Sequence, residues 1–195
     1  MTDDLAARAA AYAEDLPGLG HLRLLRVLPD QDANLIHSWV REERARFWGM
    51  NGWSREQVRD VYSFLDSLDT HHGYLMTVAG RPEGIFQTYE PLHDPVGEAY
   101  PAREEDAGMH LLLAPAAAPV PGFTATLLAA LVRFLLADPA KDRVVAEPDA
   151  RNSKAVSRFL RCGFEAGPTV QLAEKEARLV FLERAAFESR TAPMP

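Results

Sequence analysis

The sequence predicts an α/β fold of the α+β kind, in which helices cover a mixed, mostly antiparallel sheet of about seven strands. Short apolar runs and longer helix-periodic segments follow one another in the order β-α-α-β-β-β-α-β-α-β-β. Clusters of Pro and Gly separate them. A length of 195 residues, with 47% hydrophobic and 25% charged residues, suits one compact core.

The first half of the chain begins with an N-terminal extension, residues 1–20, which is rich in Ala, Asp and Glu and is expected to be helical or mobile. Leu and Val are dense in the segment that follows, and Pro29 closes it as a strand. Ser54 and Gln57 have the spacing of a capping box, so a helix is expected to begin there. The predicted elements of this half are a strand at 21–28, a helix to 40, a helix from 54, and strands at 74–79 and 84–90.

The second half begins with a Pro-rich and acidic loop at 91–106, long enough to be a lid or a substrate-facing loop. The almost wholly apolar helix that ends near Ala137 has to be buried. Gly163 stands where a helix C-cap is expected. The predicted elements are strands at 108–114 and 142–147, helices at 123–137 and 152–162, and a final strand pair at 170–172 and 177–183, with a tail at 189–195.

Charge and composition exclude several classes of partner. A net charge of −7 disfavours nucleic acid and suits a small cationic substrate better. The longest apolar run, 124–137, is interrupted by Arg133 and is too short to cross a bilayer, so no membrane association is expected. The acidic start predicts no export. Cys162 is the single cysteine, which suits a reducing, cytoplasmic environment and gives no multi-cysteine metal site.

Four segments carry a resemblance to a known family. The helix at 152–164 reads NSKAVSRFLRCGF, and the other segments are MHLLLAP at 109–115, RVVAEPDARN at 143–152 and QLAEKEARL at 171–179. Together they resemble the GNAT acyltransferase superfamily, and within it the branch that acylates N-hydroxylysine or N-hydroxycadaverine in siderophore biosynthesis. The resemblance runs from about residue 22 to 187, so it implies a GNAT domain at 21–188.

The resemblance implies a catalytic pair, His110 and Asp149, and an acyl-CoA cosubstrate, acetyl-CoA or succinyl-CoA, with no metal. It implies that the pantetheine pairs with the backbone at Leu111, Leu112 and Leu113. The pyrophosphate is expected at the start of the helix after Gly122, where free amides and the helix dipole favour anions. The residues assigned to this part of the cofactor are Gly122, Phe123, Thr124 and Ala125, with Asn152 in addition.

Each catalytic candidate also has a purely structural interpretation. His110 interrupts an apolar strand, so it is either a hydrogen-bonded core histidine or the base that accepts the proton of the attacking nitrogen. Asp149 lies just before a helix, where an N-cap role alone would explain it. Phe159 stands where many GNAT enzymes have a tyrosine that protonates the departing thiolate, so that proton has to come from elsewhere.

Three residues are candidates for substrate binding. Trp39 and Trp48 either line a pocket for an alkyl amine or pack the helices onto the sheet. Core packing is the preferred interpretation for Trp39, and the pocket is preferred for Trp48. Lys175 fits the pattern of this branch. It either binds the substrate or a CoA phosphate, or is an ordinary surface lysine. For Cys162, a packing role is favoured over that of a nucleophile.

The predicted function is direct acyl transfer from acyl-CoA to an N-hydroxylated diamine or lysine, which forms a hydroxamate. A hydroxylamine is much less basic than an alkylamine, so such an enzyme needs positioning more than a strong base. One alternative is an aminoglycoside or polyamine N-acetyltransferase with the same fold. A second alternative is an inactive acyl-CoA-binding module, which Phe159 and the single glycine of the phosphate loop favour.

Overall fold

The computed structural model describes residues 2–116 and 118–191, and it divides them into two compact units. One unit comprises residues 1–87 and 111–126, and the other comprises residues 88–110 and 127–195. The chain passes from one unit to the other within strands β4 and β5 and within helix α4. Among the described residues, no helix is both long enough and apolar enough to cross a bilayer.

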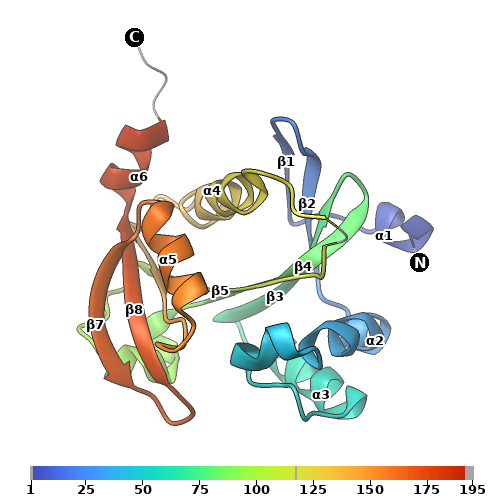
Figure 1. Cartoon of the computed structure of the whole chain (residues 1–195), viewed down its shortest axis with the longest axis horizontal. Coiled ribbons are helices and arrows are strands. Elements are labelled where there is room, and N and C mark those ends of the chain that lie inside the picture. The colour runs from blue at the N-terminus through green and yellow to red at the C-terminus, as the bar shows by residue number, and fades with distance from the viewer. Residues whose placement is uncertain (1, 117, 192–195) are drawn as a thin grey trace. The chain divides into compact units, whose positions relative to one another are not determined.

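The first unit contains a run of antiparallel strands. They are β1 (Tyr12–Leu16), β2 (Gly20–Arg26), β3 (His71–Val78) and β4 (Arg81–Tyr89), hydrogen-bonded in this order, with short α1 (Thr2–Ala7) before them. Figure 1 shows the β1–β2 and β3–β4 hairpins side by side. Gly80 in the β3–β4 turn has a φ of +76°, a conformation that glycine adopts without strain. The last residues of β5 run beside β4, where the Ala114 amide donates to the Glu83 carbonyl.

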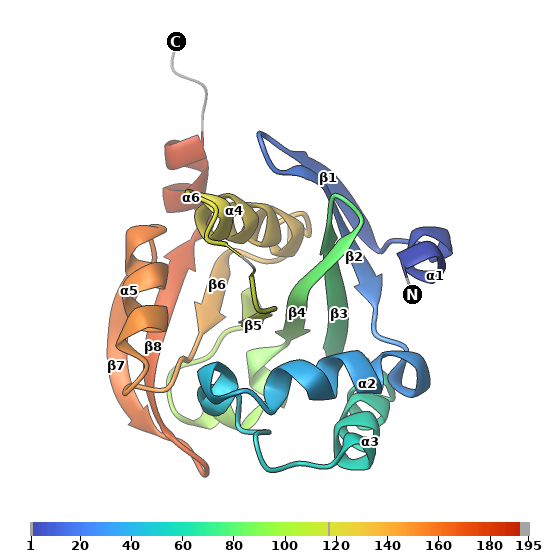
Figure 2. The same ribbon diagram turned by 45° about the vertical axis from the view of Figure 1, so that its right-hand side comes forward.

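Two helices cover one face of these strands. They are α2 (Pro29–Val40) and α3 (Arg55–Asp66), which lie against each other (Figure 2), with the 3-10 helix η1 (Glu43–Trp48) between them in sequence. The expected capping box is present, because the Ser54 side chain accepts from the Gln57 amide and the Gln57 side chain accepts from the Ser54 amide. Ile36, Val58 and Leu75 are fully buried in the core that these elements share.

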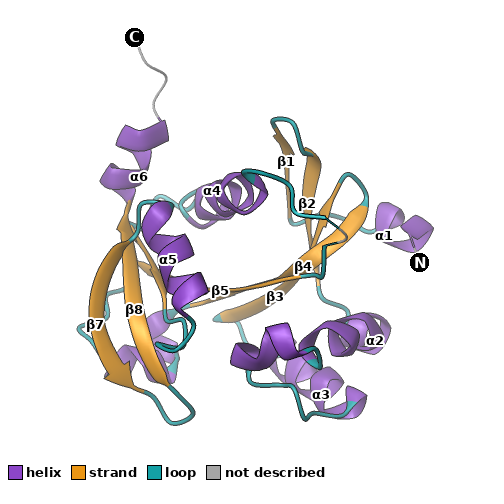
Figure 3. Cartoon of the chain, viewed as in Figure 1, coloured by secondary structure: helices purple, strands orange, loops and turns teal. Residues whose placement is uncertain are grey.

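The second unit contains the remaining strands. They are β5 (Asp106–Leu113, of which 106–110 belong here), β6 (Arg143–Ala146), β8 (Glu176–Glu183) and β7 (Glu165–Gln171), in that order across the sheet. β5 and β6 are parallel, whereas β6–β8 and β7–β8 are antiparallel. Figure 3 shows α5 (Ser153–Arg161) across β7 and β8. The unit also contains most of α4 (Phe123–Leu135), α6 (Arg184–Thr191) and the short 3-10 helices η2 (Pro91–His93) and η3 (Pro95–Glu98).

The mixed, mostly antiparallel sheet flanked by helices confirms the predicted fold class, and three details differ from expectation. Residues 12–16 of the expected N-terminal extension form β1, which pairs with β2 and brings the described strands to eight. Residues 165–169 extend β7 towards α5. Helix α6 runs into the expected tail as far as Thr191, while Met1 and residues 192–195 of the expected termini lie outside the described residues.

Candidate active site

The candidate site is centred on His110 in strand β5. Because side chains alternate along a strand, His110 and Gly108 share one face and Met109, which is fully buried, lies on the other. The His110 side chain keeps 33% of its surface exposed. It therefore stands at the boundary between the core and solvent, where a titratable group can reach a substrate.

Glu147 supplies the carboxylate that contacts this histidine. It follows β6 directly, and since β6 runs parallel to β5, its side chain reaches the middle of β5. The Glu147 side chain is only 4% exposed, and a buried carboxylate of this kind needs hydrogen-bonded partners. His110 Nε2 donates to Glu147 Oε1. In the neutral ring the proton then lies on Nε2 and the lone pair lies on Nδ1, which is the atom that can accept a proton.

Two further side chains complete the surroundings of Glu147. Tyr89, the last residue of β4, donates its hydroxyl to Glu147 Oε2. Lys175 comes from the turn between β7 and β8, and its Nζ lies 3.5 Å from Glu147 Oε1. All four side chains belong to the second unit. Segments that are far apart in the sequence thus converge on one carboxylate.

Opposing effects determine the pKa of Glu147. Burial by itself raises the pKa of the carboxyl, but the charge and hydrogen bond of His110, the charge of Lys175 and the hydrogen bond from Tyr89 outweigh it and lower the pKa to about 2. Burial and the adjacent carboxylate hold the pKa of Tyr89 well above its usual value. Glu147 is therefore a carboxylate near neutral pH, and Tyr89 is a protonated donor.

Asp149, which the resemblance implies as the second member of the catalytic pair, forms its hydrogen bonds with Arg151 of its own turn. Its side chain is 4% exposed and accepts from the guanidinium of Arg151 at 3.0 and 2.7 Å and from the Arg151 amide at 2.9 Å. The hydrogen bonds from the Arg151 side chain, and then the one from its amide, lower the pKa of Asp149. An acidic side chain that binds the amide two residues ahead stabilises a tight turn, which explains the burial of Asp149 without a catalytic role.

The predicted cofactor residues fall at two helix starts and one strand end. Leu111, Leu112 and Leu113 close β5, and the Leu113 carbonyl accepts from Arg44. Gly122, with a φ of +77°, immediately precedes α4, so Phe123, Thr124 and Ala125 form the first turn, where backbone amides have no intrahelical acceptors. Asn152 is the N-cap of α5, and its side chain accepts from the Ala155 amide at 3.2 Å.

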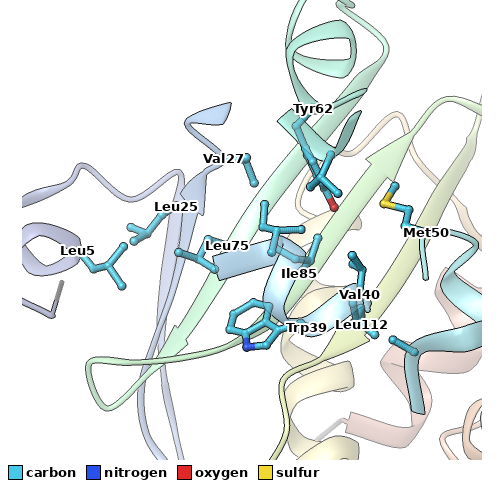
Figure 4. Close-up of a cluster of buried hydrophobic side chains, with 13 residues drawn as sticks. Leu5, Leu25, Val27, Trp39, Val40, Met50, Tyr62, Leu75, Ile85 and Leu112 are labelled. Atoms are coloured by element: carbon cyan, nitrogen blue, oxygen red, sulfur yellow. The ribbon is translucent and has the colours of Figure 1, made fainter. Parts of the chain in front are cut away.

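The tryptophans predicted as possible substrate contacts lie in the first unit. Trp39 is 5% exposed and packs in the core of that unit, beside Val40 and among the strand residues that Figure 4 shows. This position agrees with the preferred core interpretation. Trp48 is partly buried against the same cluster, so one of its faces is also used for packing.

Phe159 in α5 and Cys162 at its C-cap are both partly buried. The rings of Phe159 and Phe164 meet edge to face, with 5.0 Å between their centroids. Burial raises the pKa of the Cys162 thiol, which makes it a poor nucleophile. No group of three or more His, Cys, Asp or Glu side chains within residues 2–116 and 118–191 is arranged to hold a metal ion.

Sequence reasoning missed Glu147 and Tyr89. The sequence offered a partial signal for Glu147, because this acid directly follows the apolar residues Val144–Ala146 of a buried strand, and a carboxylate that is buried there needs a partner. The family resemblance implies Asp149, two residues further along the chain, as the catalytic carboxylate. Tyr89 had no comparable signal, since a tyrosine at a strand end is common.

The fold and this site define an acyl-CoA-dependent N-acyltransferase. Residues 28–172 match the family model described as an acetyltransferase (GNAT) domain, so the chain belongs to the GNAT acetyltransferase family. It is 27% identical over 84% of its length, and 84% of the relative, to an aminoglycoside N(6')-acetyltransferase type 1 of Klebsiella pneumoniae. It is 29% identical to an N-hydroxyputrescine acetyltransferase of Acinetobacter baumannii, over 83% of this chain and 76% of that protein.

Solved structures support the same class. An aminoglycoside acetyltransferase in complex with coenzyme A matches with a TM-score of 0.77 and 25% identity, over 88% of this chain and 99% of that one. The relatives are N-acetyltransferases, which confirms the predicted enzyme class and acyl-CoA as cosubstrate, and favours an active enzyme over an inactive binding module. The relatives include both an N-hydroxyputrescine acetyltransferase and an aminoglycoside acetyltransferase, so family membership does not by itself specify the acceptor.

Proposed function

We propose that the chain transfers an acyl group from acyl-CoA to the nitrogen of an N-hydroxylated diamine or lysine, which forms a hydroxamate of the kind used in siderophores. The observation that carries the proposal is the internal charge balance of the site. Its two carboxylates, Glu147 and Asp149, already have cationic partners in Lys175 and Arg151. A polycationic acceptor needs several unpaired carboxylates, whereas an N-hydroxylated diamine or lysine carries only one ammonium group, because its hydroxylamine nitrogen is neutral near pH 7.

The reaction in this proposal is a direct displacement. The hydroxylamine nitrogen attacks the thioester carbonyl, the new C–N bond forms, and Nδ1 of His110 accepts the N–H proton. The tetrahedral intermediate then expels the CoA thiolate as the C–S bond breaks. The proton returns from His110, directly or through water, to give free CoA, so His110 ends neutral and no covalent enzyme intermediate is required.

Glu147 has the supporting role in this mechanism. As a carboxylate it holds the Nε2–H of His110, so Nδ1 presents the lone pair, and it stabilises the imidazolium that forms transiently. Asp149 holds the turn between β6 and α5 through Arg151. For the cosubstrate, either acetyl-CoA or succinyl-CoA, we assign the pantetheine to Leu111–Leu113 and the pyrophosphate to the first turn of α4.

The second candidate function is aminoglycoside N-acetylation, and the similarity to the Klebsiella enzyme and to the coenzyme A complex favours it. The two functions are separated by incubating the purified protein with acetyl-CoA or succinyl-CoA and one acceptor at a time. The acceptors are N-hydroxyputrescine, N-hydroxycadaverine, N-hydroxylysine, kanamycin and spermidine. With the hydroxylamines we expect release of free CoA thiol and a product with the mass of the hydroxamate. Turnover with kanamycin or spermidine alone would overturn the proposal.

Lys175 provides a second test of the same proposal. Removal of its charge in Lys175→Ala leaves Glu147 with one cation fewer, so the ratio of kcat/KM for kanamycin to that for the hydroxylamine should rise by about fivefold. Lys154→Ala is the matched control, because it removes an equal charge from the exposed face of α5. An equal change of the ratio in both variants would show that net charge alone, and not the charge at the site, determines acceptor choice.

A further inference from the structure

Tyr89 contacts both members of the His110–Glu147 pair. It is 4% exposed at the end of β4, and its hydroxyl donates to Glu147 Oε2. Its ring also lies against the imidazole of His110, with 4.9 Å between centroids and 37° between the ring planes. One buried side chain thus touches the proton acceptor and the carboxylate that orients it.

The hydrogen bonds divide the two oxygens of Glu147 between different partners. Oε1 faces His110 and Lys175, and Oε2 faces Tyr89. A carboxylate bound at one oxygen can turn about its last single bond, whereas a donor on the second oxygen fixes its plane. We propose that Tyr89 is a positioning residue, which locks Glu147 so that Oε1 holds the Nε2–H of His110 and the ring lone pair is on Nδ1.

Gly108 provides an independent observation for this role. It lies on the same face of β5 as His110, and a Cβ built on it would overlap the ring of Tyr89. A glycine inside a strand weakens the strand, so its presence is best explained by the close approach that it permits. Gly108 therefore makes the space in which the Tyr89 ring reaches His110 and Glu147 together.

The proton of Tyr89 does not take part in the transfer. Burial and the charge of Glu147 hold the pKa of Tyr89 well above its ordinary value, so the hydroxyl is a donor near neutral pH. Loss of the hydroxyl therefore changes the orientation of the pair and not the number of protons that it can exchange. The consequence is specific: the transfer step should slow while the binding of acyl-CoA is preserved.

The test uses Tyr89→Phe and Gly108→Ala in the full chain, with Tyr100→Phe as matched control. Tyr100 is also a buried tyrosine whose hydroxyl donates to a buried carboxylate, that of Asp106 at 2.8 Å. Asp106 is in turn paired with Arg143 at 2.7 Å. The control variant thus loses an equivalent hydrogen bond in the same buried cluster while the hydrogen bond from Tyr89 to Glu147 remains, so its melting temperature should fall about as much as that of Tyr89→Phe.

Two readouts separate positioning from stability. The first is the 15N NMR shifts of the His110 ring, which distinguish the Nε2–H from the Nδ1–H tautomer without any substrate. We expect the Nε2–H form in the wild type and Tyr100→Phe, and a mixture of tautomers in Tyr89→Phe and Gly108→Ala. The second is turnover with acetyl-CoA and N-hydroxyputrescine, where kcat should fall about tenfold in both Tyr89→Phe and Gly108→Ala, with KM for acetyl-CoA within about twofold.

The kinetic readout rests on the proposed function, whereas the NMR readout does not. If the wild type shows no turnover with hydroxylamines, the proposed function fails, and the tautomer populations still test the role of Tyr89. Unchanged His110 shifts in Tyr89→Phe would overturn the inference. It would also be overturned if Tyr100→Phe altered the His110 shifts, or lowered kcat, as much as Tyr89→Phe.

Discussion

Glu147 and Asp149 are two residues apart, yet their surroundings give them different chemistry. Glu147 is bound by His110, Tyr89 and Lys175, whereas Asp149 is bound by Arg151 of its own turn. If Glu147 orients the base, Glu147→Gln should lower kcat by about 100-fold, because the amide no longer favours the required tautomer or stabilises the imidazolium. Steady-state kinetics with the best hydroxylamine acceptor measures this.

The comparison variant for that prediction is Asp149→Asn. It weakens a turn and should therefore lower the melting temperature while reducing kcat much less than Glu147→Gln does. The opposite ranking, with the larger loss of kcat in Asp149→Asn, would restore Asp149 as the catalytic carboxylate that the resemblance implies.

The lowered pKa of Glu147 also predicts how stability depends on pH. The folded-state pKa of about 2 lies below the ordinary value of 4.5, so the carboxylate stabilises the fold above pH 4.5, and this contribution is lost as the pH falls towards 2. Its size is up to about 3 kcal/mol. Urea unfolding from pH 7 to pH 2.5 should show a steeper loss of unfolding free energy in the wild type than in Glu147→Gln. Parallel curves would contradict the assignment.

At the scale of single elements, the N-cap of helix α5 is Asn152. Asn152 accepts from the Ala155 amide and so satisfies one of the unpaired donors at the start of the helix. Asn152→Ala should lower the unfolding free energy by about 1 kcal/mol, or the melting temperature by about 3 °C. Asn152→Asp should restore the melting temperature, since aspartate caps equally well.

The same pair of variants tests whether Asn152 also binds acyl-CoA. Calorimetric unfolding gives the capping effect, and KM for acetyl-CoA gives the contact with the cosubstrate. A carboxylate beside the CoA phosphates would repel them, so an unchanged KM in Asn152→Asp would limit Asn152 to its capping role. A severalfold higher KM in Asn152→Asp, at the wild-type melting temperature, would support the cofactor contact predicted from the sequence.

At the scale of the whole molecule, acyl-CoA should stabilise the folded chain. Saturation with CoA at 100 times its Kd raises the unfolding free energy by about 2.7 kcal/mol. Ala125→Asp places a negative charge in the first turn of α4, where Ala125 is exposed. Without ligand, the positive end of the helix dipole stabilises the new negative charge, so the melting temperature should stay the same or rise slightly. With CoA, repulsion of the pyrophosphate should raise KM about tenfold and reduce the thermal shift.

Thermal unfolding with and without CoA checks this prediction. Arg133→Asp is not a suitable control, because it reverses a charge in the last turn of the same helix and disturbs the dipole there. Ala125→Ser is suitable, since it keeps the size and neutrality of the site. An equal CoA-induced shift in Ala125→Asp and in the wild type would place the pyrophosphate elsewhere.

The sequence by itself determined most of the fold, because local patterns specify local structure. The apolar periodicity of α2 and α4, the capping box at Ser54 and the glycine after α5 act through neighbours a few residues away, so their effect can be read from the chain. Strand β1 escaped prediction because Tyr12–Leu16 is polar and half-exposed, and its pairing with β2 supplies the structure that its composition does not indicate.

The site divides in the same way. His110 was predictable, since a histidine inside an apolar strand has to find a partner, and Lys175 followed from the family resemblance. Tertiary structure alone decided that the partner is Glu147, and that Tyr89 holds its second oxygen across the space left by Gly108. The physical reason is that register and the parallel pairing of β5 with β6 determine which side chains meet, and the order of residues along the chain does not contain these distances.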